Sequence, residues 1–130
     1  DADAILRDIL TTPVSPELLP ANGGEISQKT EELVGSYELH DLFLYYFLKG
    51  KGPKELYDIA IGTLDFGEEE VYKTLGTFLR RFFSQQFKRN CAPEAPLVCL
   101  SIAPSVWNMP SDMASAAFMA EYGRIKRRQS

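Results

Sequence analysis

Three polar side chains near the C-terminal end of a predicted long helix could hold an anionic ligand. At about 100° per residue, Arg81 and Lys88 lie about 20° apart on such a helix, with Gln85 near them. All three lie beside an apolar stripe, while Arg89 points back into the line of Phe82. A row of cations and an amide next to a buried seam suits a phosphate or carboxylate. The alternative is an ordinary solvated flank whose cations complement the negative end of the helix dipole.

The segment from Thr11 to Gly35 is a second candidate for a functional role. It is longer than the roughly 12 to 15 residues that ordered loops usually reach. Among rigidifying prolines it holds hydroxyl residues and acids, which include Thr11, Thr12, Ser15, Glu17 and Glu25. Two interpretations stay open: a lid over a substrate, and a segment whose packing partner lies outside this chain.

No complete catalytic or metal-binding pattern is visible in the sequence. His40 is the only histidine, and its neighbour Asp41 does not share its helix face. Cys91 and Cys99 are eight positions apart, which matches no zinc spacing. We therefore expect no catalytic residue and no metal ligand, and we expect both cysteines to be reduced, structural thiols.

The composition is typical of one globular domain. The 130 residues are 45% apolar and 25% charged, which excludes a disordered or collagen-like chain. A net charge of −4 argues against broad nucleic-acid binding. No apolar run reaches the roughly 18 residues of a membrane span, and the first residues show no signal pattern, so we expect a cytoplasmic protein.

The apolar periodicity predicts an all-α or nearly all-α chain. Ser36 is expected to cap one helix, and Pro53 to open the next. A short extended segment is expected over Leu97–Ile102. The predicted helices are Asp3–Leu10, Tyr37–Lys49, Pro53 to about Leu64, Glu68 to about Arg89, and Pro110 to about Ile125.

Five blocks of the sequence resemble the C-terminal part of the glutamine-dependent NAD synthetases. They occur in the family's order and cover most of the chain from Ile9 to about Tyr122. Each block alone would be weak, whereas together they are specific. The blocks are Thr12–Pro20, Gln28–Gly35, Tyr37–Asp41, Phe78–Arg89 and Met109–Asp112.

The resemblance implies the C-terminal helical fragment of an α/β adenine-nucleotide-hydrolase-like (Rossmann-like) synthetase domain. Residues 1–35 would form a short helix and an active-site lid loop, and residues 36–130 the C-terminal helical region. In this family of ligases, ATP with Mg²⁺ adenylylates the carboxylate of deamido-NAD, and ammonia then displaces AMP. The ammonia comes from glutamine, which an N-terminal nitrilase-like domain hydrolyses. The family's Ser-Gly-Gly-x-Asp-Ser loop and that domain are missing here, so we expect this fragment alone to be inactive.

The resemblance also implies ligand contacts at three positions of this sequence. Ser15 falls where the family contacts the ATP phosphates, Glu17 lies on an acidic position of the same loop, and Lys88 matches a lysine that contacts deamido-NAD. ATP and Mg²⁺ would be bound mainly by the rest of the parent enzyme, which we expect to be a homo-oligomer. Between Cys91 and Met109 the sequence is shorter than the family pattern and lacks its basic residues, so no contact is carried over there.

Two other interpretations are kept. One is a helical interaction module that kept the fold and lost the chemistry, which the missing basic residues favour and Ser15 and Lys88 oppose. The other is an ammonia-dependent NAD synthetase, which the block from Ser84 to Arg89 argues against.

Overall fold

The structure is a computed structural model that describes residues 2–11, 34–91, 93, 100–102 and 114–126. Of these residues 79% are helical and none lies in a strand, which confirms the prediction of an all-α or nearly all-α chain. The chain divides into two compact units, Asp1–Val34 and Gly35–Ser130, which are described separately.

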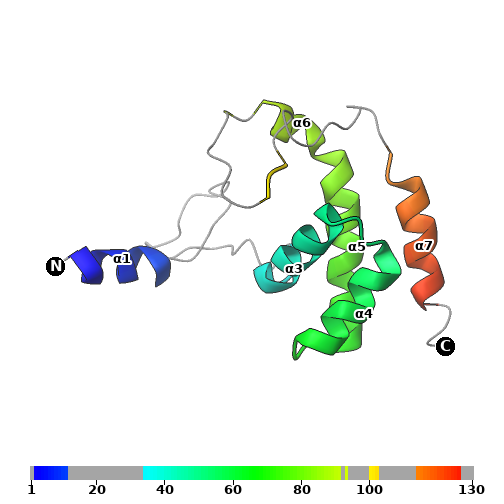
Figure 1. The fold of residues 1–130 in the computed structure, drawn as a ribbon, viewed down its shortest axis with the longest axis horizontal. Coiled ribbons are helices and arrows are strands. Elements are labelled where there is room, and N and C mark those ends of the chain that lie inside the picture. The colour runs from blue at the N-terminus through cyan, green and yellow to red at the C-terminus, as the bar shows by residue number, and fades with distance from the viewer. Residues whose placement is uncertain (1, 12–33, 92, 94–99, 103–113, 127–130) are drawn as a thin grey trace, which may run out of the picture. The chain divides into compact units, whose positions relative to one another are not determined.

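The described part of the first unit is mainly the helix α1, Ala2–Thr11 (Figure 1). It matches the predicted helix Asp3–Leu10. An ion pair one turn apart, from Arg7 Nε to Asp3 Oδ2 at 2.9 Å, and a hydrogen bond from the Thr11 hydroxyl to the Asp8 carbonyl at 3.0 Å support it locally. None of its residues is buried.

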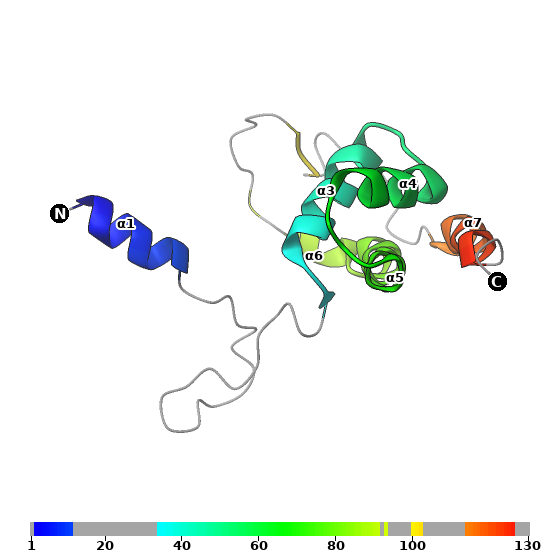
Figure 2. The ribbon, with the colours of Figure 1, turned by 90° about the horizontal axis from the view of Figure 1, so that it is seen from below.

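The second unit contains five described helices around one core. Figure 2, in which α5 is seen nearly end-on, shows α3 and α4 on one side of α5 and α7 on another. Helix α5 contacts every other helix of the unit, and α4 also contacts α3 and α7. The helices are α3 (Tyr37–Leu48), α4 (Pro53–Thr63), α5 (Glu68–Ser84), α6 (Gln86–Asn90) and α7 (Ala116–Lys126).

Helix α3 has a capped first turn and buries one stripe of side chains in the core. The Ser36 hydroxyl accepts a hydrogen bond from the Glu38 backbone N–H at 3.2 Å, which confirms the predicted cap. Leu39, Phe43 and Phe47 are buried, each four residues after the last. The sequence of this helix is apolar on nearly every face, which is typical of a helix that is central or covered by another element. In the structure Leu42, Leu44 and Tyr46 are also partly buried against the core, and the central helix is α5.

Helix α5 supplies the largest share of the core, as its periodicity predicted. Its buried apolar side chains include Val71, Leu75, Phe78, Leu79, Phe82 and Phe83. Phe47 of α3 packs edge-on against Phe82, with ring centroids 4.9 Å apart, and Phe118 of α7 lies 4.9 Å from Phe83. Three helices thus share one aromatic cluster.

The prediction of one helix from Glu68 to about Arg89 is wrong at its C-terminal end. α5 ends at Ser84, and Gln85 adopts φ −99° and ψ 14°, away from helical values. The Gln85 N–H still bonds to the Arg81 carbonyl at 2.9 Å, and α6 then starts in a new direction. Phe87 follows Phe83 at the spacing of the stripe but is 59% exposed, so the buried apolar stripe ends at Phe83 and does not hold the chain to a straight helix beyond it.

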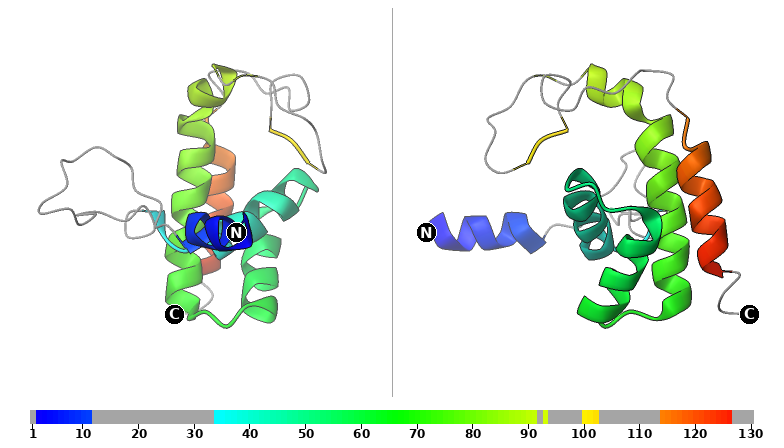
Figure 3. Two further views of the ribbon diagram at one scale, coloured as in Figure 1. Left: turned by 90° about the vertical axis from the view of Figure 1, so that its left-hand side faces the viewer. Right: turned by 45° about the vertical axis from the view of Figure 1, so that its right-hand side comes forward.

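Helix α7 packs alongside α5 through close contacts at a glycine (Figure 3). The Tyr122 ring stacks on the Tyr72 ring at 4.2 Å, and its hydroxyl donates to the Tyr72 carbonyl at 3.1 Å. A Cβ at Gly76 would lie 2.6 Å from the Tyr122 hydroxyl, so only glycine permits this approach. Burial, followed by the hydrogen bond to Tyr72, raises the pKa of the Tyr122 phenol.

The start predicted for α7 is also wrong. The helix begins at Ala116, and residues 114 and 115 are not helical, so the predicted start at Pro110 does not hold. The residues predicted as caps, Ser111 and Asp112, lie outside the described residues, as does the first half of the predicted extended segment Leu97–Ile102.

A carboxylate of α7 also accepts a hydrogen bond from a backbone N–H in the first turn of α4. Glu121 Oε1 accepts a hydrogen bond from the Lys54 backbone N–H at 3.2 Å, and Pro53 occupies the first turn as predicted. A Cβ at Gly52 would lie 3.2 Å from the same Glu121 oxygen. The negative charge therefore lies at the positive end of the α4 dipole.

Candidate functional site: the end of helix α5 and helix α6

The structure describes only one of the three ligand-contacting residues expected from the sequence. Ser15 and Glu17 lie outside the described residues, so their contacts with ATP stay predictions. Lys88 lies on α6 and is exposed. The candidate site is therefore built from the end of α5 and from α6, which Figure 1 shows at one end of the unit.

Because the helix breaks at Gln85, the side chains of Arg81, Gln85 and Lys88 do not share one continuous helix. Arg81 lies in the last turn of α5, whereas Lys88 lies in α6. An angle of about 20° between them holds only along one continuous helix. Both cations are exposed, while Gln85 is half-buried at the junction. The structure thus keeps Lys88 accessible without aligning it with Arg81.

The Arg89 side chain extends from α6 back to Phe82 of α5, the residue toward which the sequence predicted it to point. Its Nη2 donates a hydrogen bond to the Phe82 carbonyl at 2.6 Å, and its guanidinium carbon lies 4.4 Å from the centre of the Phe82 ring. Partial burial lowers the pKa of the Arg89 guanidinium, which still carries its proton at neutral pH. This side chain spans the break between the two helices.

Two neighbours of Lys88 were not singled out from the sequence. Gln86 is 3% exposed and turns the first residue of α6 into the interior. Phe87 is 59% exposed, and it directly precedes Lys88 in the sequence. A cation and an exposed ring can together bind a ligand with an anionic and a flat apolar part. The exposed Phe87, which breaks the polar pattern of this segment, is the signal that could have been noticed.

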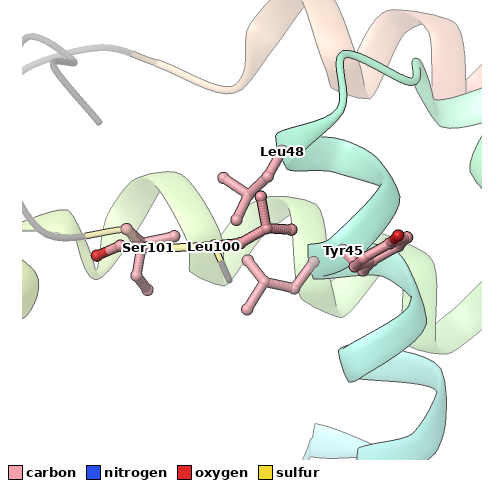
Figure 4. A pocket seen from close by; sticks show the side chains of 6 residues that line it. Tyr45, Leu48, Leu100 and Ser101 are labelled. Atoms are coloured by element: carbon pink, nitrogen blue, oxygen red, sulfur yellow. The ribbon is translucent and has the colours of Figure 1, made fainter. Parts of the chain in front are cut away.

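An apolar hollow of about 280 Å³ lies elsewhere on the unit, between α3 and residues 100–102. Figure 4 shows Leu48 and Leu100 directed toward each other, with the Tyr45 ring directed away. Lys49 Nζ lies 4.5 Å from the centre of that ring. The described residues that line the hollow carry no charged side chain, so they offer no ionic partner to a phosphate or a carboxylate. Its lining residues are Leu44, Tyr45, Leu48, Leu100, Ser101 and Ile102.

The remaining reactive side chains do not assemble into a site within the described residues. His40 is half-buried, and its ring lies 6.0 Å from Phe78. Cys91 is a free thiol, as expected, but it is exposed and is not part of the core. Cys99 lies outside the described residues. Across residues 2–11, 34–91, 93, 100–102 and 114–126, no three His, Cys, Asp or Glu side chains form a group that could hold a metal ion.

No helix within the described ranges combines the length and the apolar character that crossing a bilayer requires.

Comparison with known proteins finds a similarity that extends over most of this chain. The chain is 32% identical, over 145 aligned positions, to a glutamine-dependent NAD(+) synthetase of Mycobacterium leprae (strain TN). The alignment covers 94% of this chain and 21% of that protein, so the chain spans about a fifth of the relative's length. No protein-family model matches the chain, and no solved structure does. The similarity confirms the resemblance drawn from the sequence blocks.

Proposed function

We propose that this chain, which matches a glutamine-dependent NAD⁺ synthetase along nearly its whole length, is part of such an enzyme. The observation that carries the proposal is the 32% identity over 94% of the chain. The nearly all-helical fold agrees with the helical fragment that the sequence blocks implied.

The proposed reaction is the ATP-dependent amidation of deamido-NAD. The carboxylate of deamido-NAD resists attack by ammonia until adenylylation by ATP, with release of pyrophosphate, makes it electrophilic. Ammonia derived from glutamine then displaces AMP and gives NAD. ATP and Mg²⁺ would be bound mainly by parts of the enzyme outside this chain, because the Ser-Gly-Gly-x-Asp-Ser loop of the family does not occur in this sequence. The chain alone is expected to be inactive, and its partners are the nucleotide-binding core and the glutaminase domain.

Within this reaction Lys88 is the proposed contact with deamido-NAD. Its exposure on α6 supports that role, since a buried ammonium could not reach a ligand. Ser15 is the proposed contact with the ATP phosphates, and Glu17 the acidic residue of the same loop. Each of these assignments rests on the position of the residue within a matching sequence block.

The test uses the full-length enzyme that contains this chain. With ATP, Mg²⁺, glutamine and deamido-NAD, we expect NAD, AMP and pyrophosphate to form in equal amounts. Lys88→Met should raise the KM for deamido-NAD by roughly ten- to a hundredfold, the cost of losing a charge-assisted contact. Lys73→Met, which removes an exposed cation from an earlier turn of α5, is the matched control and should leave that KM unchanged.

Two outcomes would contradict the proposal at different levels. A full-length protein that forms no NAD under these conditions would favour a helical interaction module that has lost the chemistry. An active enzyme in which Lys88→Met leaves the KM unchanged would overturn the assignment of Lys88 alone.

A further inference from the structure

Helix α6 cannot hold its own orientation. It has five residues, well below the roughly 12 that an isolated helix needs to be even marginally stable in water. The direction in which Lys88 projects therefore depends on how α6 is attached to the rest of the unit. Two residues of α6 attach it within the described part of the chain. Gln86 is buried, and Arg89 donates a hydrogen bond to the Phe82 carbonyl of α5.

The Arg89 attachment is made at two points on one core residue. The guanidinium donates a hydrogen bond to the Phe82 carbonyl, and its central carbon lies over the Phe82 ring, so two contacts hold it against this residue. Phe82 itself is 5% exposed and packs against Phe47 and Phe78. Arg89 is thus tied to a part of the molecule that close packing keeps rigid.

The geometry points to Arg89 as a positioning residue that fixes α6 and thereby directs Lys88 toward its ligand. This inference rests on the proposed function, in which Lys88 contacts deamido-NAD. Arg89 follows Lys88 directly, and one residue turns a helix by about 100°, so Arg89 can face α5 while Lys88 faces outward. Arg89 therefore acts through Lys88 and not on the ligand.

A double-mutant cycle in the full-length enzyme tests this coupling. The variants are Lys88→Met, Arg89→Met and the double variant, with the KM for deamido-NAD, kcat and the melting temperature measured for each. We expect Arg89→Met to raise the KM about tenfold, within the hundredfold that a misplacement of about 1 Å can cost, with kcat little changed. In the double variant Arg89→Met should add nothing to the effect of Lys88→Met.

The possible results separate this inference from the proposed function. If Lys88→Met raises the KM but Arg89→Met does not, or if the two effects multiply in the double variant, Arg89 does not position Lys88 and only the inference fails. If Lys88→Met has no effect, the assignment of Lys88 and this inference both fail, whereas the proposed reaction is tested separately by the formation of NAD.

A second variant keeps the test valid if Arg89→Met unfolds the enzyme. Arg89→Lys keeps the charge and can donate one hydrogen bond to the Phe82 carbonyl, but it lacks the flat guanidinium. It should give a KM between those of the native enzyme and Arg89→Met. A KM equal to the native value would show that the two-point attachment is not required and would overturn the inference.

Discussion

At the scale of single residues, the packing of this unit depends on glycines that admit a neighbouring side chain. Gly35, at φ 93°, lies against Thr74, and Gly76 lies against Tyr122. At Gly76 an added Cβ would lie 2.6 Å from the phenol oxygen and 2.7 Å from the ring carbon that carries it. Both distances are too short for any real contact, so the Tyr122 ring would have to leave its position over Tyr72.

We therefore predict that Gly76→Ala destabilises the chain. Overpacking should outweigh the helix propensity gained with alanine and cost about 1–2 kcal/mol of unfolding free energy. Gly62→Ala is the matched control, because Gly62 is also helical and an added Cβ there meets nothing within 4 Å. It should stabilise by about 0.5 kcal/mol. Urea unfolding measures both, and a stabilising Gly76→Ala would show that Tyr122 can relax without loss.

At the scale of the elements, the start of α4 is held by carboxylates from two places in the chain. Glu121 reaches it from α7, and Glu55 belongs to its own first turn. Glu55 accepts hydrogen bonds from Lys51 Nζ at 2.7 Å and from the Gly52 backbone N–H at 3.1 Å. These bonds, the one from Lys51 first, lower the pKa of Glu55 below its ordinary value of 4.5.

The lowered pKa predicts a definite pH dependence of stability. A carboxylate whose pKa is depressed by folding stabilises the folded state above its unfolded pKa, and that contribution is lost as the pH falls through the folded pKa. Glu55→Gln should therefore be less stable than the native chain at pH 7, and the difference should shrink as the pH falls below about 4.5. Thermal unfolding from pH 7 to pH 3 measures it. A difference that is constant with pH would mean that the charge of Glu55 contributes nothing.

At the scale of the whole molecule, the described helices of the two units differ in how far their apolar side chains are buried. The second unit buries its stripes in one core, whereas α1 buries none of its residues. Four apolar side chains of α1 are between 59% and 83% exposed, and they recur at helical spacing: Ile5, Leu6, Ile9 and Leu10. In contrast, α3 buries the stripe of Leu39, Phe43 and Phe47, so its apolar side chains are less exposed than those of α1.

We predict that the chain self-associates at high concentration through α1, since exposed apolar faces of amphipathic helices associate in water. Replacing Leu6 and Ile9 by glutamine should lower the average mass measured by sedimentation. Tyr45→Gln, at a 40% exposed position on α3, is the control and should leave the mass unchanged. A native chain that sediments as a monomer at every concentration would contradict the prediction.

The sequence by itself determined the features that residues within one or two turns decide. The Ser36 cap, Pro53 in the first turn of α4 and the buried stripe of α5 follow from local hydrogen bonding and from a period of about 3.6 residues. The resemblance to the NAD synthetases and the place of Lys88 within it were likewise readable, because both are patterns of residue order.

Only the tertiary structure decided the features that depend on residues far apart in the chain. Tyr122 donates to the carbonyl of Tyr72, 50 positions away, and Glu121 caps a helix 67 positions before it. The break at Gln85 is of the same kind. The sequence places Phe87 four residues after Phe83, as in a stripe that continues, yet Phe87 is exposed, Gln86 is buried and Arg89 lies over the Phe82 ring. No local pattern encodes such contacts, because their energy exists only once the helices have met.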